Sequence, residues 1–182
     1  FFPPNDTGPQ AMHFQPTIDT FVIALFLGLL VLAAINDVAE YRIPNRINLA
    51  IAALYPAHVL ASPGSVDWMG GLIVASCVLG VGVVLFALRH MGGGDIKMIA
   101  ATALWAGPLG ITDFLIITAL VGGVLAIAKL APVRAGLAMT IGRFTGVEDK
   151  ETQFVAQIPY GVAIAFGGFS VGALMLGAGR IL

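Results

Sequence analysis

Charged residues are scarce in this sequence of 182 residues, where Asp, Glu, Lys and Arg together make up 10% of the chain. Soluble domains contain about 25% charged residues, whereas 58% of this chain is hydrophobic and its mean hydropathy is +0.95. The net charge of −1 gives no sign of a nucleic-acid partner or of long-range electrostatic steering. These shortages exclude an ordinary soluble domain and indicate an integral membrane protein that forms one bundle.

Cysteine is almost absent as well. The single thiol, Cys77, lies inside an apolar run and has no partner for a disulfide within the chain. His13, His58 and His90 are too scattered to form a zinc site with it. We therefore expect no metal and no other cofactor, and we interpret Cys77 as a small buried hydrophobic residue.

Six apolar runs organise the rest of the chain. A run of twenty helical residues rises about 30 Å, which is one hydrocarbon thickness. We therefore predict an all-α integral membrane bundle of about six transmembrane helices, with residues 17–182 as one polytopic domain. Residues 1–16, which are polar and Pro-rich at their start, are interpreted as an extracytoplasmic tail or a non-native leading stretch. The predicted segments are 17–36, 47–61, 69–88, 96–105, 111–130 and 158–176.

The basic residues predict the orientation of these segments. If the six segments alternate in direction, only Arg180 falls on one side of the membrane. Because cytoplasmic loops are enriched in Lys and Arg, the other side is predicted to be cytoplasmic. Both termini then lie outside, and the longest loop, residues 131–157, lies in the cytoplasm. The residues on the cytoplasmic side are Arg42, Arg46, Arg89, Lys97, Lys129, Arg134, Arg143 and Lys150.

Two acidic residues lie at the predicted cytoplasmic ends of membrane segments. Asp37 ends the first segment and Asp95 begins the fourth, so the topology brings them to the same membrane face. Two neighbouring carboxyl groups that share one proton can act together, one deprotonating a water molecule while the other polarises a peptide carbonyl. The alternative for Asp95 is a helix cap. Asp37 has no such alternative, because a carboxylate at a helix C-terminus opposes the dipole.

The stretch HMGGGDIKMI, residues 90–99, contains the second acid. Glycines at 92, 93 and 94 predict a non-helical stretch that lines a cavity, with backbone conformations closed to other residues and room for an extended substrate. Lys97 has two interpretations. It favours the ionised form of the two acids or contacts the substrate, or it anchors the segment by extending its ammonium group to the polar layer of the membrane. Both interpretations of Lys97 remain open.

Three motifs in order resemble the type IV prepilin peptidases, which are membrane aspartic peptidases of the GxGD class. The motifs are D-x-x-x-x-R-I-P-N from Asp37, GGGDIKM from Gly92 and IPYGVAIAFGG from Ile158. The match is closest to the short forms that serve Flp/Tad-type pilus systems. The resemblance implies that Asp37 and Asp95 are the catalytic pair, and that Gly92 and Gly94 are the motif glycines.

The same resemblance implies the reaction and its location. Such enzymes remove the leader peptide of prepilins or pseudopilins after a glycine, at the cytoplasmic face of the bacterial inner membrane. Longer relatives carry a cysteine-rich cytoplasmic domain and also N-methylate the new pilin terminus. The predicted first cytoplasmic loop is short and lacks cysteine, so we expect neither zinc nor methyltransferase activity.

Two other classes of function are compatible with the acids. In a small proton-coupled carrier, Asp37 and Asp95 would carry protons between glycine-rich helices. Acids near the middle of the bilayer would favour a carrier, whereas acids at segment ends favour a protease that acts at the interface. A non-catalytic pilus assembly factor is the third possibility, and the presence of both acids argues against it.

Overall fold

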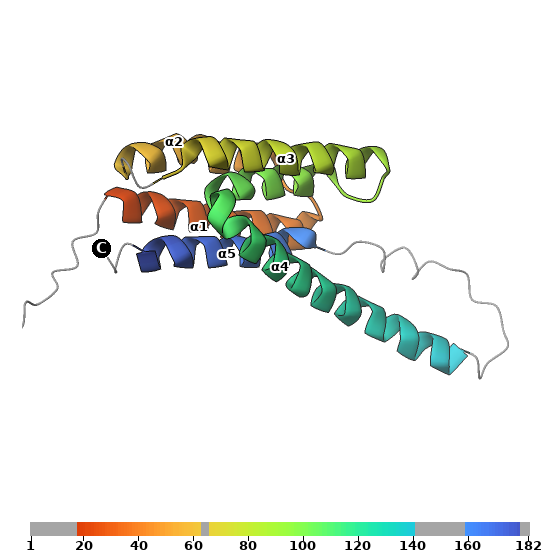
Figure 1. The fold of residues 1–182 in the computed structure, drawn as a ribbon. Coiled ribbons are helices and arrows are strands. Elements are labelled where there is room, and N and C mark those ends of the chain that lie inside the picture. Colours follow the sequence, from red (N-terminus) through yellow and green to blue (C-terminus); the bar gives the residue numbers. More distant parts are fainter. Residues whose placement is uncertain (1–17, 63–65, 141–158, 179–182) are drawn as a thin grey trace, which may run out of the picture.

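The computed structural model describes residues 18–62, 66–140 and 159–178, and in these ranges the chain forms five helices and no strand. The all-α prediction is therefore confirmed for the described part of the chain. Figure 1 shows the helices packed into a bundle, with one long arm of α4 projecting from it. The helices are α1 (Ile18–Glu40), α2 (Asn45–Ala61), α3 (Trp68–Ala87), α4 (Gly93–Thr140) and α5 (Tyr160–Ala178).

Local sequence accounts for the ends of the first helices. Tyr41 follows α1 with a φ of 50°, a left-handed conformation that stops the helix. Pro44 has an extended backbone and precedes the first residue of α2, in keeping with the missing N–H of proline. Asp67 caps α3, because its Oδ1 accepts a hydrogen bond of 2.9 Å from the backbone N–H of Gly70.

The predicted fourth and fifth segments form the two arms of α4, which is broken at Gly107. This residue has φ 57° and ψ −170°, which lie outside the helical region, and the proline after it cannot donate a backbone hydrogen bond. Figure 1 shows the chain reversing between the two arms. The predicted loop 131–157 is partly wrong, because α4 continues to Thr140. Residues 141–157 of that loop lie outside the described ranges.

Four of the described helices are long and apolar enough to cross a membrane. They are α1, α3, α4 as far as Ala128, and α5 as far as Gly177. The 17-residue α2 is not among them. The structure thus confirms a bundle of apolar helices, and the number of about six spans stays a prediction.

The core of the bundle lies between α1, both arms of α4, and α5. Phe26, Phe114 and Ile164 are completely buried there. Glycine allows close helix contact: a Cβ atom at Gly167 of α5 would lie 2.8 Å from the backbone oxygen of Phe114. This close contact fixes α5 on α4.

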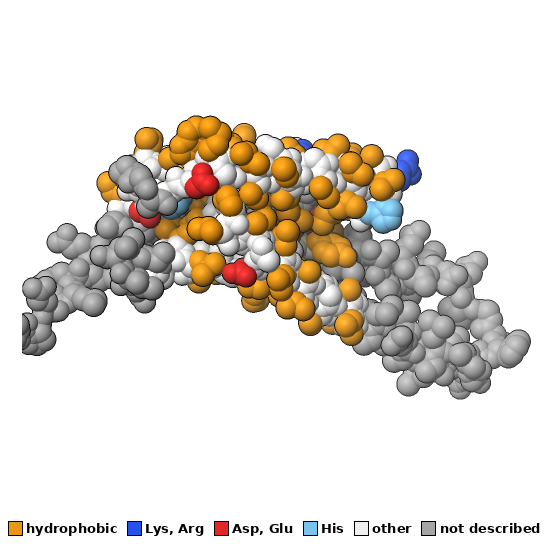
Figure 2. Space-filling view, in the orientation of Figure 1, with side chains coloured by type: hydrophobic (Ala, Val, Ile, Leu, Met, Phe, Trp, Pro, Cys, Tyr) orange, Lys and Arg blue, Asp and Glu red, His pale blue; other side chains and the backbone are white. Residues whose placement is uncertain are grey.

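The outer surface of the bundle is apolar, as Figure 2 shows for one face, where charged side chains are few. The helix α3 contributes exposed residues such as Ile73, Val81 and Phe86, which suits contact with hydrocarbon. Cys77 also lies on α3 and is exposed, so its prediction as a buried residue is wrong. Hydropathy does not distinguish a side chain that faces lipid from one that faces protein, because both environments are apolar.

An aromatic cluster joins α1, α2 and α4 away from the two catalytic candidates. The ring of Trp105 stacks on Phe26 at a centroid distance of 4.3 Å and on His58 at 5.2 Å. Its Nε1 donates a hydrogen bond of 3.0 Å to the backbone oxygen of Ile51. Nδ1 of His58 lies 2.5 Å from the carboxylate of Asp19 at the start of α1. These contacts fix how the three helices are placed relative to one another.

Candidate active site

The helices α1, α4 and α5 meet at one end of the bundle. The C-terminal end of α1 lies beside the N-terminal ends of α4 and α5, as Figure 1 shows. Asp37 lies in the last turn of α1 and only 5% of its surface is exposed. Asp95 lies in the first turn of α4 and is half-buried. We call this the Asp37 end of the bundle.

The N-terminus of α5 holds Asp37 in place. The backbone N–H of Gly161 donates a hydrogen bond of 2.6 Å to Oδ2 of Asp37, and this bond is buried. A carboxylate is unfavourable at the C-terminal end of its own helix, but the free N–H groups at the start of another helix stabilise it. The expected conflict between Asp37 and the dipole of α1 is therefore offset by α5.

Gly161 has to be glycine for Asp37 to occupy this position. A Cβ atom at residue 161 would lie 2.8 Å from Oδ2, 2.9 Å from Cβ and 3.0 Å from Cγ of Asp37. These separations are shorter than ordinary contacts between heavy atoms, which begin near about 3.5 Å. The third sequence motif thus supplies both the hydrogen-bond donor for Asp37 and the space that its side chain fills.

Asp95 lies close enough to Asp37 for the charge of one carboxyl group to act on the other. Its own Oδ2 lies near Gly92, where a Cβ atom would approach it to 2.9 Å. The first-turn position of Asp95 suits the helix dipole, and the cap interpretation stays a prediction. The cap interpretation alone does not account for the nearby Asp37.

Two of the three glycines at 92–94 differ from the prediction, whereas Gly92 lies before the helix. The helix α4 begins at Gly93, so Gly93 and Gly94 belong to its first turn and not to a non-helical stretch. Among the glycines of the described ranges, only Gly107 has a positive φ. The backbone at positions 92–94 therefore does not need the positive φ angles that glycine allows. Gly94 is needed for close packing, because a Cβ atom there would lie 3.3 Å from the backbone oxygen of Ile43.

Lys97 turns toward α2. Its Nζ donates a hydrogen bond of 2.9 Å to Oδ1 of Asn45, the first residue of α2. The neighbouring Asn48 donates from Nδ2 to the backbone oxygen of Gly94 at 3.0 Å. These two bonds fasten the N-terminus of α4 to that of α2. Among the described residues, the partner of Lys97 is thus Asn45, and Lys97 forms no ion pair with Asp37 or Asp95.

The arrangement suits acid–base chemistry with water. Oδ2 of Asp37 accepts the hydrogen bond from Gly161, so a proton shared by the two acids belongs on Asp95 or on the other oxygen of Asp37. One carboxyl group is then available as a base and the other as an acid. In the described ranges, no three His, Cys, Asp or Glu side chains lie close enough together to hold a metal ion.

Two residues of this region were not assigned a role by the sequence reasoning. Gly161 belongs to the third motif, IPYGVAIAFGG. Its position directly after Pro159 and Tyr160, at the start of a predicted helix, was the sequence signal for a close contact there. Asn48, 4% exposed, is a buried amide between the apolar residues Ile47 and Leu49, which is a signal in itself, because buried polar groups require partners.

Comparison with known proteins agrees with this geometry. The family model described as the type IV leader peptidase family matches residues 24–127, a range that contains both Asp37 and Asp95.

The chain belongs to the type IV leader peptidase family.

This chain is similar to the prepilin leader peptidase/N-methyltransferase of Bacillus subtilis (strain 168), with 32% identity over 98 residues. That alignment covers 53% of this chain and 39% of the relative. The chain therefore spans well under half of the curated relative that it matches. No solved structure matches it significantly.

Proposed function

We propose that this protein is a membrane aspartic endopeptidase that removes the leader peptide of prepilins or pseudopilins. The main support is the pair formed by Asp37 and Asp95, which are far apart in the sequence and close enough in space to interact electrostatically. The match to the type IV leader peptidase family supports the reaction class. The relative in Bacillus subtilis is a prepilin leader peptidase by name, which supports the substrate class.

The mechanism we propose uses one water molecule and the two carboxyl groups. The ionised acid removes a proton from the water, while the protonated acid donates a hydrogen bond to the oxygen of the scissile peptide bond. The water oxygen then attacks the carbonyl carbon, and the proton of the second acid moves to the leaving nitrogen as the bond breaks. Gly161 keeps Asp37 oriented during these steps, and it acts as a positioning residue.

We further propose the finer assignments that the sequence motifs imply. Cleavage follows a glycine of a Flp-type prepilin, and it takes place at the cytoplasmic face of the bacterial inner membrane. The support for this side is the distribution of basic residues, since Arg42, Arg89 and Lys97 lie near the ends of helices at the Asp37 end of the bundle. Gly92 leaves room beside the carboxyl group of Asp95, and Gly94 and Lys97 position the start of α4, which carries that acid.

The test is replacement of each acid by its amide. Asp37→Asn retains an oxygen that can accept the hydrogen bond from Gly161, and Asp95→Asn retains a first-turn residue compatible with capping. Both variants should therefore insert at normal abundance. Each should lose cleavage of a co-expressed Flp-type prepilin by about 10²- to 10⁴-fold, because an amide can neither ionise nor pass a proton.

The double variant decides whether the acids act as a unit. Residues that act together are strongly non-additive, so the double variant should be scarcely worse than either single variant. Substantial cleavage by Asp37→Asn or Asp95→Asn at normal membrane abundance would refute the proposed pair. Persistence of cleavage in Asp95→Asn alone would show that Asp95 is a helix cap.

A further inference from the structure

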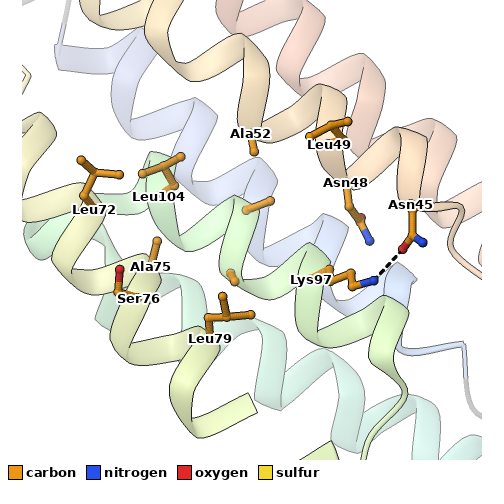
Figure 3. Close-up of a pocket in the computed structure, with 12 residues that line it drawn as sticks. Asn45, Asn48, Leu49, Ala52, Leu72, Ala75, Ser76, Leu79, Lys97 and Leu104 are labelled. Carbon is orange, nitrogen blue, oxygen red and sulfur yellow. Dashed lines mark hydrogen bonds between the residues drawn. The ribbon is translucent and has the colours of Figure 1, made fainter. Parts of the chain in front are cut away.

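A groove of about 470 Å³ opens between α2 and α3, with the first arm of α4 as its floor. Both α2 and α3 pack against α4 or its neighbours, but they make at most marginal contact with each other. Figure 3 shows the groove between these two helices. We call it the α2–α3 groove. Its lining residues are Asn45, Asn48, Leu49, Ala52, Leu72, Ala75, Ser76, Leu79, Lys97, Ala100, Ala101 and Leu104.

The lining of the groove suits a helix. Small residues such as Ala52, Ala75 and Ala100 form part of its wall and floor, and small residues allow helix backbones to approach closely in membranes. Exposed leucines, Leu49 and Leu79, lie along its edges. The stretch from residue 97 to residue 104 rises about 10 Å, or two helical turns. An apolar helix entering sideways from the bilayer would fit this length.

One end of the groove is polar and lies at the start of α4, the end of the helix that carries Asp95. In Figure 3, Asn45, Asn48 and Lys97 lie together at this end, and Leu72 and Leu104 lie toward the other. Lys97 follows Asp95 by two residues, and Asn48 holds the carbonyl group of Gly94. The polar end of the groove and the two acids therefore lie at the same end of the bundle.

The buried side chain of Asn48 also indicates which end of a bound helix lies at the polar end of the groove. Its Oδ1 is buried and has no hydrogen-bond partner among the described residues, and a buried acceptor left unpaired is unfavourable. The first four N–H groups of any helix lack partners within that helix. A helix that begins at the polar end would offer such a donor, and a small rotation about the soft χ2 bond of Asn48 would meet it.

We propose that the α2–α3 groove binds the apolar helical segment of the prepilin that directly follows the cleaved bond. This inference rests on the proposed peptidase function. The helix lies in the groove with its N-terminus beside Asn48, so the leader and the scissile bond extend past Asp95 toward Asp37. Within the bilayer the segment has to be helical, because its backbone groups have no water to bind. The groove thereby selects substrates that carry a membrane helix.

The first experiment compares two substrates and two matched variants. Ala52 lines the groove, whereas the adjacent Ala53 is exposed outside it. For each enzyme, kcat/KM is measured on a full-length Flp-type prepilin in proteoliposomes and on a short soluble peptide that ends soon after the cleavage site. The ratio of the two values should fall about tenfold in Ala52→Leu and change less than twofold in Ala53→Leu. An unchanged ratio in Ala52→Leu would overturn the proposal.

The second experiment identifies the occupant directly. A photoreactive residue is placed at Leu79, which lines the groove, and in a control at Ile73, which is exposed on the same helix but does not line it. The Leu79 probe should cross-link to the full-length prepilin and the Ile73 probe should not. Cross-linking from Leu79 only to phospholipid, or to a second copy of the enzyme, would overturn the proposal.

These two experiments separate the groove from the peptidase activity. If the wild-type protein cleaves neither substrate, the proposed function fails, and cross-linking from Leu79 still decides whether a prepilin helix enters the groove. If the wild-type protein cleaves both substrates and the ratio is the same in all variants, the peptidase proposal stands and the groove proposal fails.

Discussion

The contact between Asp37 and Gly161 provides the sharpest prediction. In Gly161→Ala, the added Cβ atom would lie 2.9 Å from Cβ and 3.0 Å from Cγ of Asp37. Contacts between carbon atoms are normally about 3.5–4.0 Å, so one side has to move by roughly 0.6–1 Å. The clash involves the stem of the side chain as well as its carboxyl tip, and a rotation of the carboxyl group alone does not relieve it.

A displacement of this size should affect catalysis more than folding. Misplacement of a catalytic group by about 1 Å costs about 10²-fold in rate, which corresponds to about 2.7 kcal/mol in the activation barrier. Alanine is also a better helix former than glycine by about 1 kcal/mol, which counteracts part of the packing strain. We therefore expect kcat on a prepilin to fall about 100-fold while the variant remains abundant in the membrane.

Gly177 offers a matched control on the same helix. A Cβ atom there would meet nothing within 4 Å, so Gly177→Ala makes the same chemical change without the clash. Its kcat should stay within twofold of the wild type. The measurement is prepilin cleavage by purified enzyme, with thermal unfolding of each variant recorded in parallel. A Gly161→Ala enzyme with normal kcat would refute the positioning role of Gly161.

Two further predictions concern orientation and cofactors. In a Cys77→Ala background, a Gly146→Cys variant should react with a membrane-impermeant thiol reagent only from the cytoplasmic side, because basic residues mark that side; labelling from the periplasm would contradict the topology. Cleavage should also persist in chelators and after treatment with thiol reagents, because two carboxyl groups supply both the acid and the base. Loss of cleavage in a chelator that is reversed by zinc would contradict the two-acid mechanism.

Several features of the fold could be predicted from the sequence because they depend on local properties of the chain. The apolar runs predict the helices α1, α3 and α5 within a few residues of their observed ends. The Gly-Pro pair at 107–108 marks the break in α4, since proline lacks a backbone donor. The order of the segments also brings Asp37 and Asp95 to one end of the bundle. If membrane helices alternate in direction, the end of the first segment and the start of the fourth lie at the same membrane face.

Other features were decided by how the helices rotate and pack on one another. Local sequence does not reveal that α5 begins against Asp37, or that Gly161 leaves the space that the Asp37 side chain fills, because this contact joins residues 124 positions apart. For the same reason the sequence misjudged Cys77, whose exposure depends on which face of α3 meets α4. Hydropathy is equal on both faces of α3, and only tertiary packing assigns one face to protein and the other to lipid.

The motif around Asp95 shows the same division. The sequence identified its glycines and its acid, but it predicted a non-helical stretch where the structure has, from Gly93 onward, the first turn of a helix. Glycine suits tight packing as well as unusual backbone angles, and the choice between these two uses depends on the neighbour. Here the neighbour of Gly94 is Ile43, which reaches it only because the turn after α1 folds back across the start of α4.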